Sequence, residues 1–248
     1  MKILVCISHV PDTTAKINFK NNETEFDKEG VQFVINPNDE FGLTKAMILK
    51  ETLGGNVTVI NVGDASTEPT LRKALAIGAD DAIRIDRVPK DAFTVASDIA
   101  EEVKAGGYDL IMGGIESIDY NGGQVMAMVA ALCNLPIVDT CVGLSIDGNK
   151  ATAMREIDGG KETLETTLPL VIAGKKGLVE EKDLRIPNMR GIMMARTKKL
   201  EVKSPTSATE KVADKKYEKP AARGNCKMIS PDNVGELVSL LHNEAKVI

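Results

Sequence analysis

The residues best suited to chemistry lie in one glycine-containing segment, residues 115–124 (IESIDYNGGQ). It follows an apolar run that ends in Gly113-Gly114, and it precedes an apolar run of good helix formers at 125–133, which predicts a buried helix. The start of a helix presents unpaired N–H groups and the positive end of the helix dipole, and glycines let a phosphate come close to them. The segment therefore predicts a phosphate site, although an ordinary strand-to-helix turn has the same pattern.

No other group of residues has the pattern of a catalytic centre. The glycines of this segment fit neither the G-x-G-x-x-G fingerprint nor the Walker pattern. No Ser/His/Asp or Cys/His constellation is apparent, and two histidines cannot build a metal site alone. A loop hydrogen bond is the expected role of His9. The four cysteines are far apart without a C-x-x-C pair, which argues against a zinc site or a disulfide framework.

Composition excludes several classes of partner. The 248 residues allow one large α/β domain with an appendage or two small domains. A net charge of −5 gives no general attraction to nucleic acid or acidic membranes, and 3% aromatic residues without tryptophan argue against stacking of single-stranded bases. The amino terminus runs directly into a predicted strand, and no apolar stretch could span a bilayer. We expect a cytoplasmic protein with no nucleic-acid partner and no membrane insertion.

Alternating strand and helix patterns must position the glycine segment. Four apolar runs have the character of buried parallel strands: 2–8, 57–62, 82–85 and 108–112. A hairpin over 15–34 is expected before the first helix, which begins after Asn36-Pro37. The repeated units predict an α/β fold with a doubly wound, mostly parallel sheet. Loops after Ser8, Val62 and Met112 would then meet in one crevice, where a nucleotide is expected and an unliganded scaffold is the alternative.

The second half of the chain adds antiparallel strands. Alternating runs at 151–157 and 161–168 flank Asp158-Gly159-Gly160, a strong hairpin signal. One more buried strand is expected at 169–173, directly after this hairpin. These strands complete the predicted nucleotide-binding domain, which extends over 1–202.

A methionine-rich segment, 186–196, ends this domain. Methionine adapts its shape to several partners and is frequent at binding surfaces. Met193 and Met194 are nevertheless expected in the core on a short helix, whereas Met189, between a proline and an arginine, is expected to be exposed.

The remaining residues, 203–248, read as an arm. Its first part is polar and lacks core periodicity, so it is a linker. A final helix is expected from Ser230, and its stripe includes Val234 and Leu237. Such an apolar stripe is expected to pack against another surface. Because a long polar arm precedes this helix, that surface is expected to belong to another subunit.

Several of these residues carry a family resemblance. The most specific are 155–164, REIDGGKETL, followed by 168–173, LPLVIA. Asn36-Pro37, Gly78-Ala79-Asp80 and the pairs Ile118-Asp119 and Gln124-Val125 add to it. On these residues, and over essentially its whole length, the chain resembles the β subunit of electron transfer flavoprotein.

The resemblance implies a Rossmann-like, adenine nucleotide alpha hydrolase-like fold and a role as an electron carrier that is not itself an enzyme. The β subunit pairs with an α subunit that carries the redox FAD. The heterodimer moves electrons from flavin dehydrogenases of the acyl-CoA dehydrogenase type, which act in fatty acid β-oxidation, to a quinone oxidoreductase or another acceptor. The β subunit itself holds a structural AMP, and its arm would pack on the α subunit.

The resemblance also implies roles for particular residues. Nucleotide contacts are expected at Cys6, Asn36, Val62, Gly63, Asp119, Gly122, Gly123, Gln124 and Val125. Thr13 matches a position that approaches the flavin of the α subunit, and Met189 matches an apolar anchor, commonly leucine, that contacts partner dehydrogenases. Methionine keeps the anchor apolar and loosens its shape.

Two other functions remain open. In electron-bifurcating members a second FAD occupies the nucleotide site, and an Asp-Gly-Asp-Thr type loop stands where this chain has Asp119-Tyr120-Asn121-Gly122. The bulk of Tyr120 near the diphosphate path favours AMP. The other alternative is a stand-alone protein that binds or hydrolyses adenine nucleotides.

Overall fold

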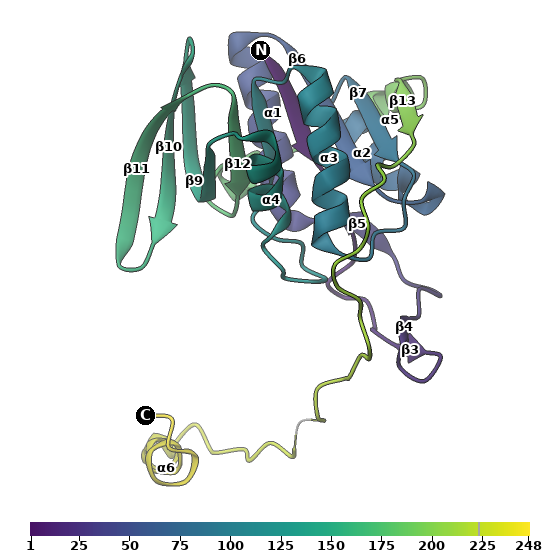
Figure 1. Ribbon diagram of the computed structural model, residues 1–248. Coiled ribbons are helices and arrows are strands. Elements are labelled where there is room, and N and C mark those ends of the chain that lie inside the picture. Colours follow the sequence, from purple (N-terminus) through teal and green to yellow (C-terminus); the bar gives the residue numbers. More distant parts are fainter. Residues whose placement is uncertain (223) are drawn as a thin grey trace.

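A mixed sheet runs through the centre of the molecule in the computed structural model, which describes residues 1–222 and 224–248 (Figure 1). Its strands are Lys2–Cys6 (β1), Asn56–Val62 (β6), Asp81–Ile85 (β7), Leu110–Gly114 (β8), Ile137–Asp147 (β9), Lys150–Ile157 (β10), Gly160–Thr167 (β11), Leu170–Gly174 (β12) and Leu200–Lys203 (β13). Across the described residues these nine strands have the order β11-β10-β9-β12-β8-β1-β6-β7-β13. Among these nine strands only β10 runs in the opposite direction to the others, which confirms the mostly parallel sheet.

Helices cover both faces of the sheet, as in a doubly wound fold. Their bounds are Pro37–Leu53 (α1), Glu68–Ile77 (α2), Ala92–Gly106 (α3), Val125–Cys133 (α4) and Met189–Ala195 (α5). On one face Leu43 of α1 and Leu75 of α2 join Val5 in a core, and α5 lies beside α2. On the other face Ile99 of α3 and Val129 of α4 belong to a second core (Figure 1). Each of these four helices thus packs apolar side chains on the sheet.

The chain reverses its direction across the sheet between β1 and β8. From β1 it proceeds through β6 to β7, and it then returns through α3 to β8 on the other side of β1. The carboxyl ends of β8, β1 and β6 therefore lie next to one another, as predicted. Open α/β sheets bind ligands at such a reversal.

The predicted hairpin of β10 and β11 is confirmed, but β9 was not predicted. Buried residues Val138, Cys141, Val142 and Leu144 interrupt the alternation expected of a strand. The cause is an irregularity at Thr140, which has φ +46°, where the register against β12 also shifts. This break in period two hides the strand in the sequence.

The hairpin predicted over 15–34 consists of two nested pairs of strands. The inner pair is β3 (Phe19–Lys20) with β4 (Glu25–Phe26), and the outer pair is β2 (His9–Pro11) with β5 (Phe33–Ile35). The second extended piece therefore pairs with the residues that directly follow β1, and the hairpin itself is shorter than predicted.

Two predictions of burial are wrong. Met193 and Met194 are 67% and 50% exposed, because α5 lies beside α2 and buries Ala195 instead. The helix at 125–133 was expected to be buried throughout, yet Ala131 and Leu132 of α4 are exposed. An apolar segment favours burial, but its sequence does not show whether it is buried within its own chain or against another protein.

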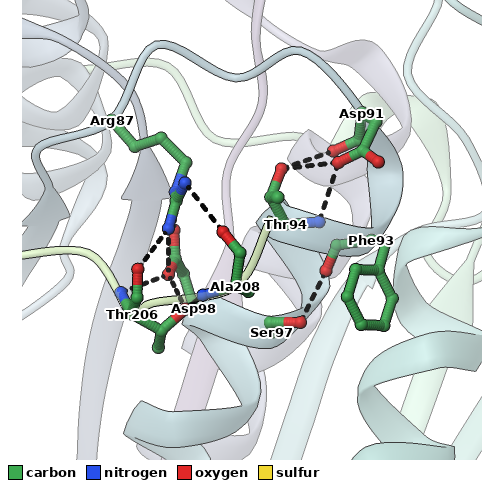
Figure 2. A network of polar contacts seen from close by, with 8 residues as sticks. All are labelled: Arg87, Asp91, Phe93, Thr94, Ser97, Asp98, Thr206 and Ala208. Atoms are coloured by element: carbon green, nitrogen blue, oxygen red, sulfur yellow. Dashed lines mark hydrogen bonds and ion pairs between the residues drawn. The ribbon is translucent and has the colours of Figure 1, made fainter. Parts of the chain in front are cut away.

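The first part of the arm is fastened to α3 (Figure 2). The buried carboxylate of Asp98 accepts hydrogen bonds from the backbone N–H and hydroxyl of Thr206, each at 2.7 Å, and forms an ion pair with Arg87 at 2.6 Å. Arg87 also donates to the Thr206 carbonyl at 2.7 Å. Asp91, the N-cap of α3, accepts from the backbone N–H of Lys211 at 2.6 Å. These contacts fix the direction in which the arm leaves the domain.

The arm ends in α6 (Val234–Leu240), which continues as a π-helical turn, Leu241–Ala245. Figure 1 shows α6 away from the sheet and its helices. Within the described chain none of the α6 residues is buried, and Val234 and Val238 are 60% and 50% exposed. The apolar stripe thus has no cover in this chain, and its docking on another subunit stays a prediction.

Candidate functional site

Asn36 joins the entrance of α1 to the segment that follows β8. Its side chain is fully buried: Nδ2 donates to the carbonyl oxygen of Glu116 at 2.9 Å, and Oδ1 accepts from the N–H of Ile118 at 3.3 Å. Its own N–H donates to the carbonyl of Ser8, beyond the end of β1, at 3.1 Å. Asn38 donates to the same Glu116 carbonyl at 3.1 Å. Asn36 therefore lies inside the predicted crevice, where it organises the segment 115–124.

Asp39 lies beside Asn36 in the first turn of α1 and is 3% exposed. One carboxylate oxygen accepts from the N–H of Ser8 at 2.7 Å, and the other accepts from the N–H of Gly114 at 2.6 Å. Burial raises the pKa of Asp39 to about 6, although these hydrogen bonds act in the opposite direction. The carboxylate thus ties the chain at the end of β1 to the end of β8.

The residues directly before α4, 122–124, have backbone N–H groups without hydrogen-bond partners among the described residues. Gly122 and Gly123 are exposed, and Gly123 has φ +58°, a conformation that favours glycine. A Cβ at Gly122 would meet no atom within 4 Å. Among the described residues no group accepts a hydrogen bond from the backbone N–H of Gly122, Gly123 or Gln124. With the first turn of α4, which begins at Val125, these donors form an arrangement that suits an anion.

The end of β6 contributes buried backbone and one orphaned oxygen. Val62 and Gly63 are buried, and the backbone N–H and carbonyl of Gly63 both have partners within the protein. A Cβ at Gly63 would collide with Thr67 and Asn61. Asn61 donates from Nδ2 to the Ile7 carbonyl at 2.8 Å, while its buried Oδ1 has no partner among the described residues. Such an atom needs a donor from water or a ligand.

Cys6 lies at the last position of β1, one of the three strand ends that meet at the reversal of the sheet. It is buried in the same core as Val62. Burial and the nearby Asp39 raise the pKa of its thiol above the ordinary value. The thiol therefore stays protonated, and Cys6 acts there as a small apolar residue.

His9 lies at the start of β2, shortly after the end of β1. Its ring stacks on Phe33 with centroids 4.3 Å apart, and Nδ1 lies 2.8 Å from the Thr70 hydroxyl oxygen. Burial, assisted by a nearby lysine, lowers its pKa, while Asp64 and Asp119 act in the opposite direction. The predicted hydrogen bond is confirmed, but His9 makes it from strand β2 and not from a loop; the exposed Asp119 is close enough to act on His9.

Two predicted residues lie on the surface outside this group. Thr13 is exposed in the loop between β2 and β3, beside Asp12, whose carboxylate accepts hydrogen bonds from Thr14. Met189 is 75% exposed at the start of α5, as predicted. The other predicted residues surround the ends of β8, β1 and β6.

The chemistry that this site offers is recognition. Asn61 supplies an unpartnered amide oxygen, and the residues before α4 supply free N–H donors, while Asn36 holds the segment 115–124. No cluster of three or more His, Cys, Asp or Glu side chains able to hold a metal ion occurs in the part of the chain that the structure describes. Cavities of about 440 and 190 Å³ lie along β10 and β11 and beside α3, away from this site. The same described residues contain no helix long and apolar enough to cross a bilayer.

Asp39, Asn38 and Asn61 were not predicted as site residues. Asp39 and Asn38 read as ordinary residues of a helix entrance, and Asn61 reads as part of a strand. All three have short polar side chains close to the predicted crevice in the sequence. Asn38 and Asp39 directly follow Asn36-Pro37, and Asn61 lies near the end of an apolar strand.

Comparison with known proteins places the chain in a family. Residues 24–208 match the family model described as Electron transfer flavoprotein domain. A Bacillus subtilis (strain 168) protein named electron transfer flavoprotein subunit beta is 34% identical over 262 residues, which cover all of both chains. The Homo sapiens protein of the same name is 33% identical over 211 residues, or 83% of this chain and 82% of its own. The Arabidopsis thaliana protein, named as the mitochondrial subunit beta, is 32% identical over 265 residues and the whole of both chains.

The matched region includes most of the crevice and the hairpin of β10 and β11, whose residues carry the resemblance. The whole-length relatives extend the likeness to β1 and to the arm. The chain therefore belongs to the electron transfer flavoprotein family, among its β subunits.

Proposed function

We propose that the crevice at the ends of β8, β1 and β6 holds AMP in a structural role. The observation that carries this proposal is the group of free N–H donors at 122–124, at the start of α4. Backbone N–H groups at a helix start suit a phosphate. The Oδ1 of Asn61 offers an acceptor to an adenine amino group or a ribose hydroxyl, whereas the buried Asn36 amide, bonded to Glu116 and Ile118, would shape the site from within. The orphaned Oδ1 of Asn61 supports the fit, because a ligand donor would satisfy it.

The other predicted residues complete this arrangement. Cys6, Val62 and Gly63 would form its floor, and Asp119 and Val125 its rim. Tyr120 is 63% exposed in the segment that precedes α4. The bulk of its ring on the path of a diphosphate favours AMP over a second FAD.

An FAD carried mainly by an α subunit would supply the one-electron chemistry. The heterodimer would accept electrons from flavin dehydrogenases of the acyl-CoA dehydrogenase type and pass them to a quinone oxidoreductase or another acceptor, in the cytoplasm and in fatty acid β-oxidation. The uncovered stripe of α6 supports docking on the α subunit, and the exposed Met189 supports an anchor for dehydrogenases. Thr13 would face the flavin of the α subunit.

Co-expression with a candidate α subunit tests this function. We expect a complex with one copy of each chain and one flavin, measured by light scattering and by absorbance after denaturation. Two flavins per complex would instead indicate a bifurcating subunit. A chain that stays monomeric in the presence of the α subunit and hydrolyses ATP would contradict the carrier function.

A further inference from the structure

The first turn of α1 fastens the two strand ends that flank the reversal point of the sheet. We name the side chains of Asn36, Asn38 and Asp39 the α1 clasp. Asp39 binds one backbone N–H on each side, at Ser8 and at Gly114, with distances of 2.7 and 2.6 Å. The two asparagines hold the residues that follow Gly114, through the Glu116 carbonyl and the N–H of Ile118.

The clasp packs so closely against Gly114 that no side chain fits at this position. A Cβ at Gly114 would lie 2.6 Å from both the Asn38 Cβ and an Asp39 carboxylate oxygen, and 3.0 Å from the Asn36 amide nitrogen. Asn36 and Asp39 are 0% and 3% exposed, so water cannot readily replace these contacts. The segment 115–124 begins at this packed point and ends with the free N–H donors before α4.

We propose that Asp39 is a positioning residue of the nucleotide site: its ionised carboxylate holds the ends of β1 and β8 together and thereby places the segment 115–124 for the phosphate. This inference rests on the proposed binding of AMP. Asp39 acts through Ser8 and Gly114, and no contact between its carboxylate and the nucleotide is required.

The role depends on charge as well as on shape. An ionised carboxylate accepts hydrogen bonds at both oxygens, whereas a protonated carboxyl group or an asparagine amide turns a donor toward one of the two N–H groups. One of the two contacts is then lost. The pKa of Asp39, about 6, places this change within a range of pH in which proteins are readily measured.

Other titratable groups near Asp39 can be distinguished from it. The Cys6 thiol on β1 stays protonated, and β8 carries no titratable side chain. On α1 itself, Glu40 is paired with Lys73 at 3.0 Å. Further charged or titratable groups nearby include His9, Lys28, Asp64 and Asp119, and the segment 115–124 itself carries Glu116 and Tyr120. They are unchanged in a variant of Asp39, so a comparison of variant and wild type at each pH isolates the carboxylate.

The test compares AMP affinity of wild type and Asp39→Asn in the full heterodimer, stripped of nucleotide and titrated by calorimetry at pH 8 and pH 5. At pH 8 we expect the variant to bind about tenfold more weakly, the effect of losing one charged hydrogen bond. At pH 5 the two affinities should agree within about twofold, because Asp39 is then protonated in the wild type. The phosphate of AMP titrates near pH 6, but this effect cancels in the ratio.

Glu40→Gln is the matched control, since it removes a carboxylate from the next position of the same helix. Its affinity ratio to wild type should not change between the two pH values. An Asp39→Asn ratio near one at pH 8, or a tenfold ratio that persists at pH 5, would overturn the positioning role.

Adenosine 5′-sulfate provides a second measurement if Asp39→Asn does not fold. Because its sulfate stays singly charged near pH 6 but occupies the place of the phosphate, binding of this analogue to wild type should release a proton from Asp39, seen by calorimetry in buffers of different ionisation enthalpy. Binding without proton release would overturn the inference alone. A wild-type heterodimer that binds no adenine compound would refute the proposed function as well.

Discussion

Replacing Asp98 by asparagine should release the arm from α3. The Asp98 side chain is fully buried and binds Arg87 at 2.6 Å and the N–H and hydroxyl of Thr206 at 2.7 Å each. Asparagine has nearly the same shape but no charge. The Arg87 side chain, which is 15% exposed, would keep its charge without a counterion. The variant therefore tests the charge of the contact and leaves its volume unchanged.

The expected effect on stability is large. Removal of one partner from a buried ion pair costs about 3–5 kcal/mol, because the other charge stays buried. Arg87 keeps some contact with solvent, so we expect a loss near the lower limit, about 3 kcal/mol. For a chain of this size this corresponds to a decrease of roughly 6–12 °C in melting temperature.

Urea unfolding of the full chain measures this loss, and hydrogen exchange measures where it acts. The amide of Thr206 should exchange faster in Asp98→Asn, while amides of β1 retain their protection relative to global unfolding. Glu101→Gln is the control, since Glu101 is exposed on the same helix. A loss of less than about 1 kcal/mol, the range of surface pairs, together with unchanged exchange at Thr206, would refute the reasoning.

Three further predictions concern other parts of the chain. Met189→Ala should lower kcat/KM for electron transfer from a partner dehydrogenase by the factor that corresponds to about 2 kcal/mol, while flavin content stays intact. Unchanged kcat/KM would remove the assignment of Met189 as an anchor. Gly114→Ala should lower the free energy of unfolding, measured in urea, by about 1–3 kcal/mol, because the new Cβ would collide with the α1 clasp. Gly122→Ala, where a Cβ meets no atom, should lower it by less than about 1 kcal/mol, and equal losses would contradict this reasoning. Burial raises the pKa of Asp91, but hydrogen bonds from Lys211 and Thr94 outweigh it and lower the pKa from 3.8 to about 2. Asp91 thus stabilises the fold above pH 4, and this contribution is lost as the pH falls through 2, so Asp91→Asn should flatten the dependence of stability on pH in acid unfolding.

The alternation of strands and helices could be predicted because local signals mark it. Gly54 and Gly78 end α1 and α2, and Asn36-Pro37 opens α1. The crevice followed from this alternation, since the ends of parallel strands meet at one edge of a sheet.

The clasp could not be predicted, because its contacts join distant parts of the chain. Asp39 binds N–H groups that lie 31 and 75 positions away, and both are ordinary backbone in the sequence. The irregular period of β9 similarly depends on its partner β12. Met193 and Met194 were mispredicted for a different reason. Their apolar side chains are typical of a core, but no part of the described chain buries them.

The identity of the nucleotide released from the purified heterodimer on denaturation tests the central claim most directly. Mass spectrometry should find one AMP and one FAD per heterodimer. Two FAD molecules without AMP would contradict the structural nucleotide, and a heterodimer free of adenine compounds other than the single FAD would contradict the binding site itself.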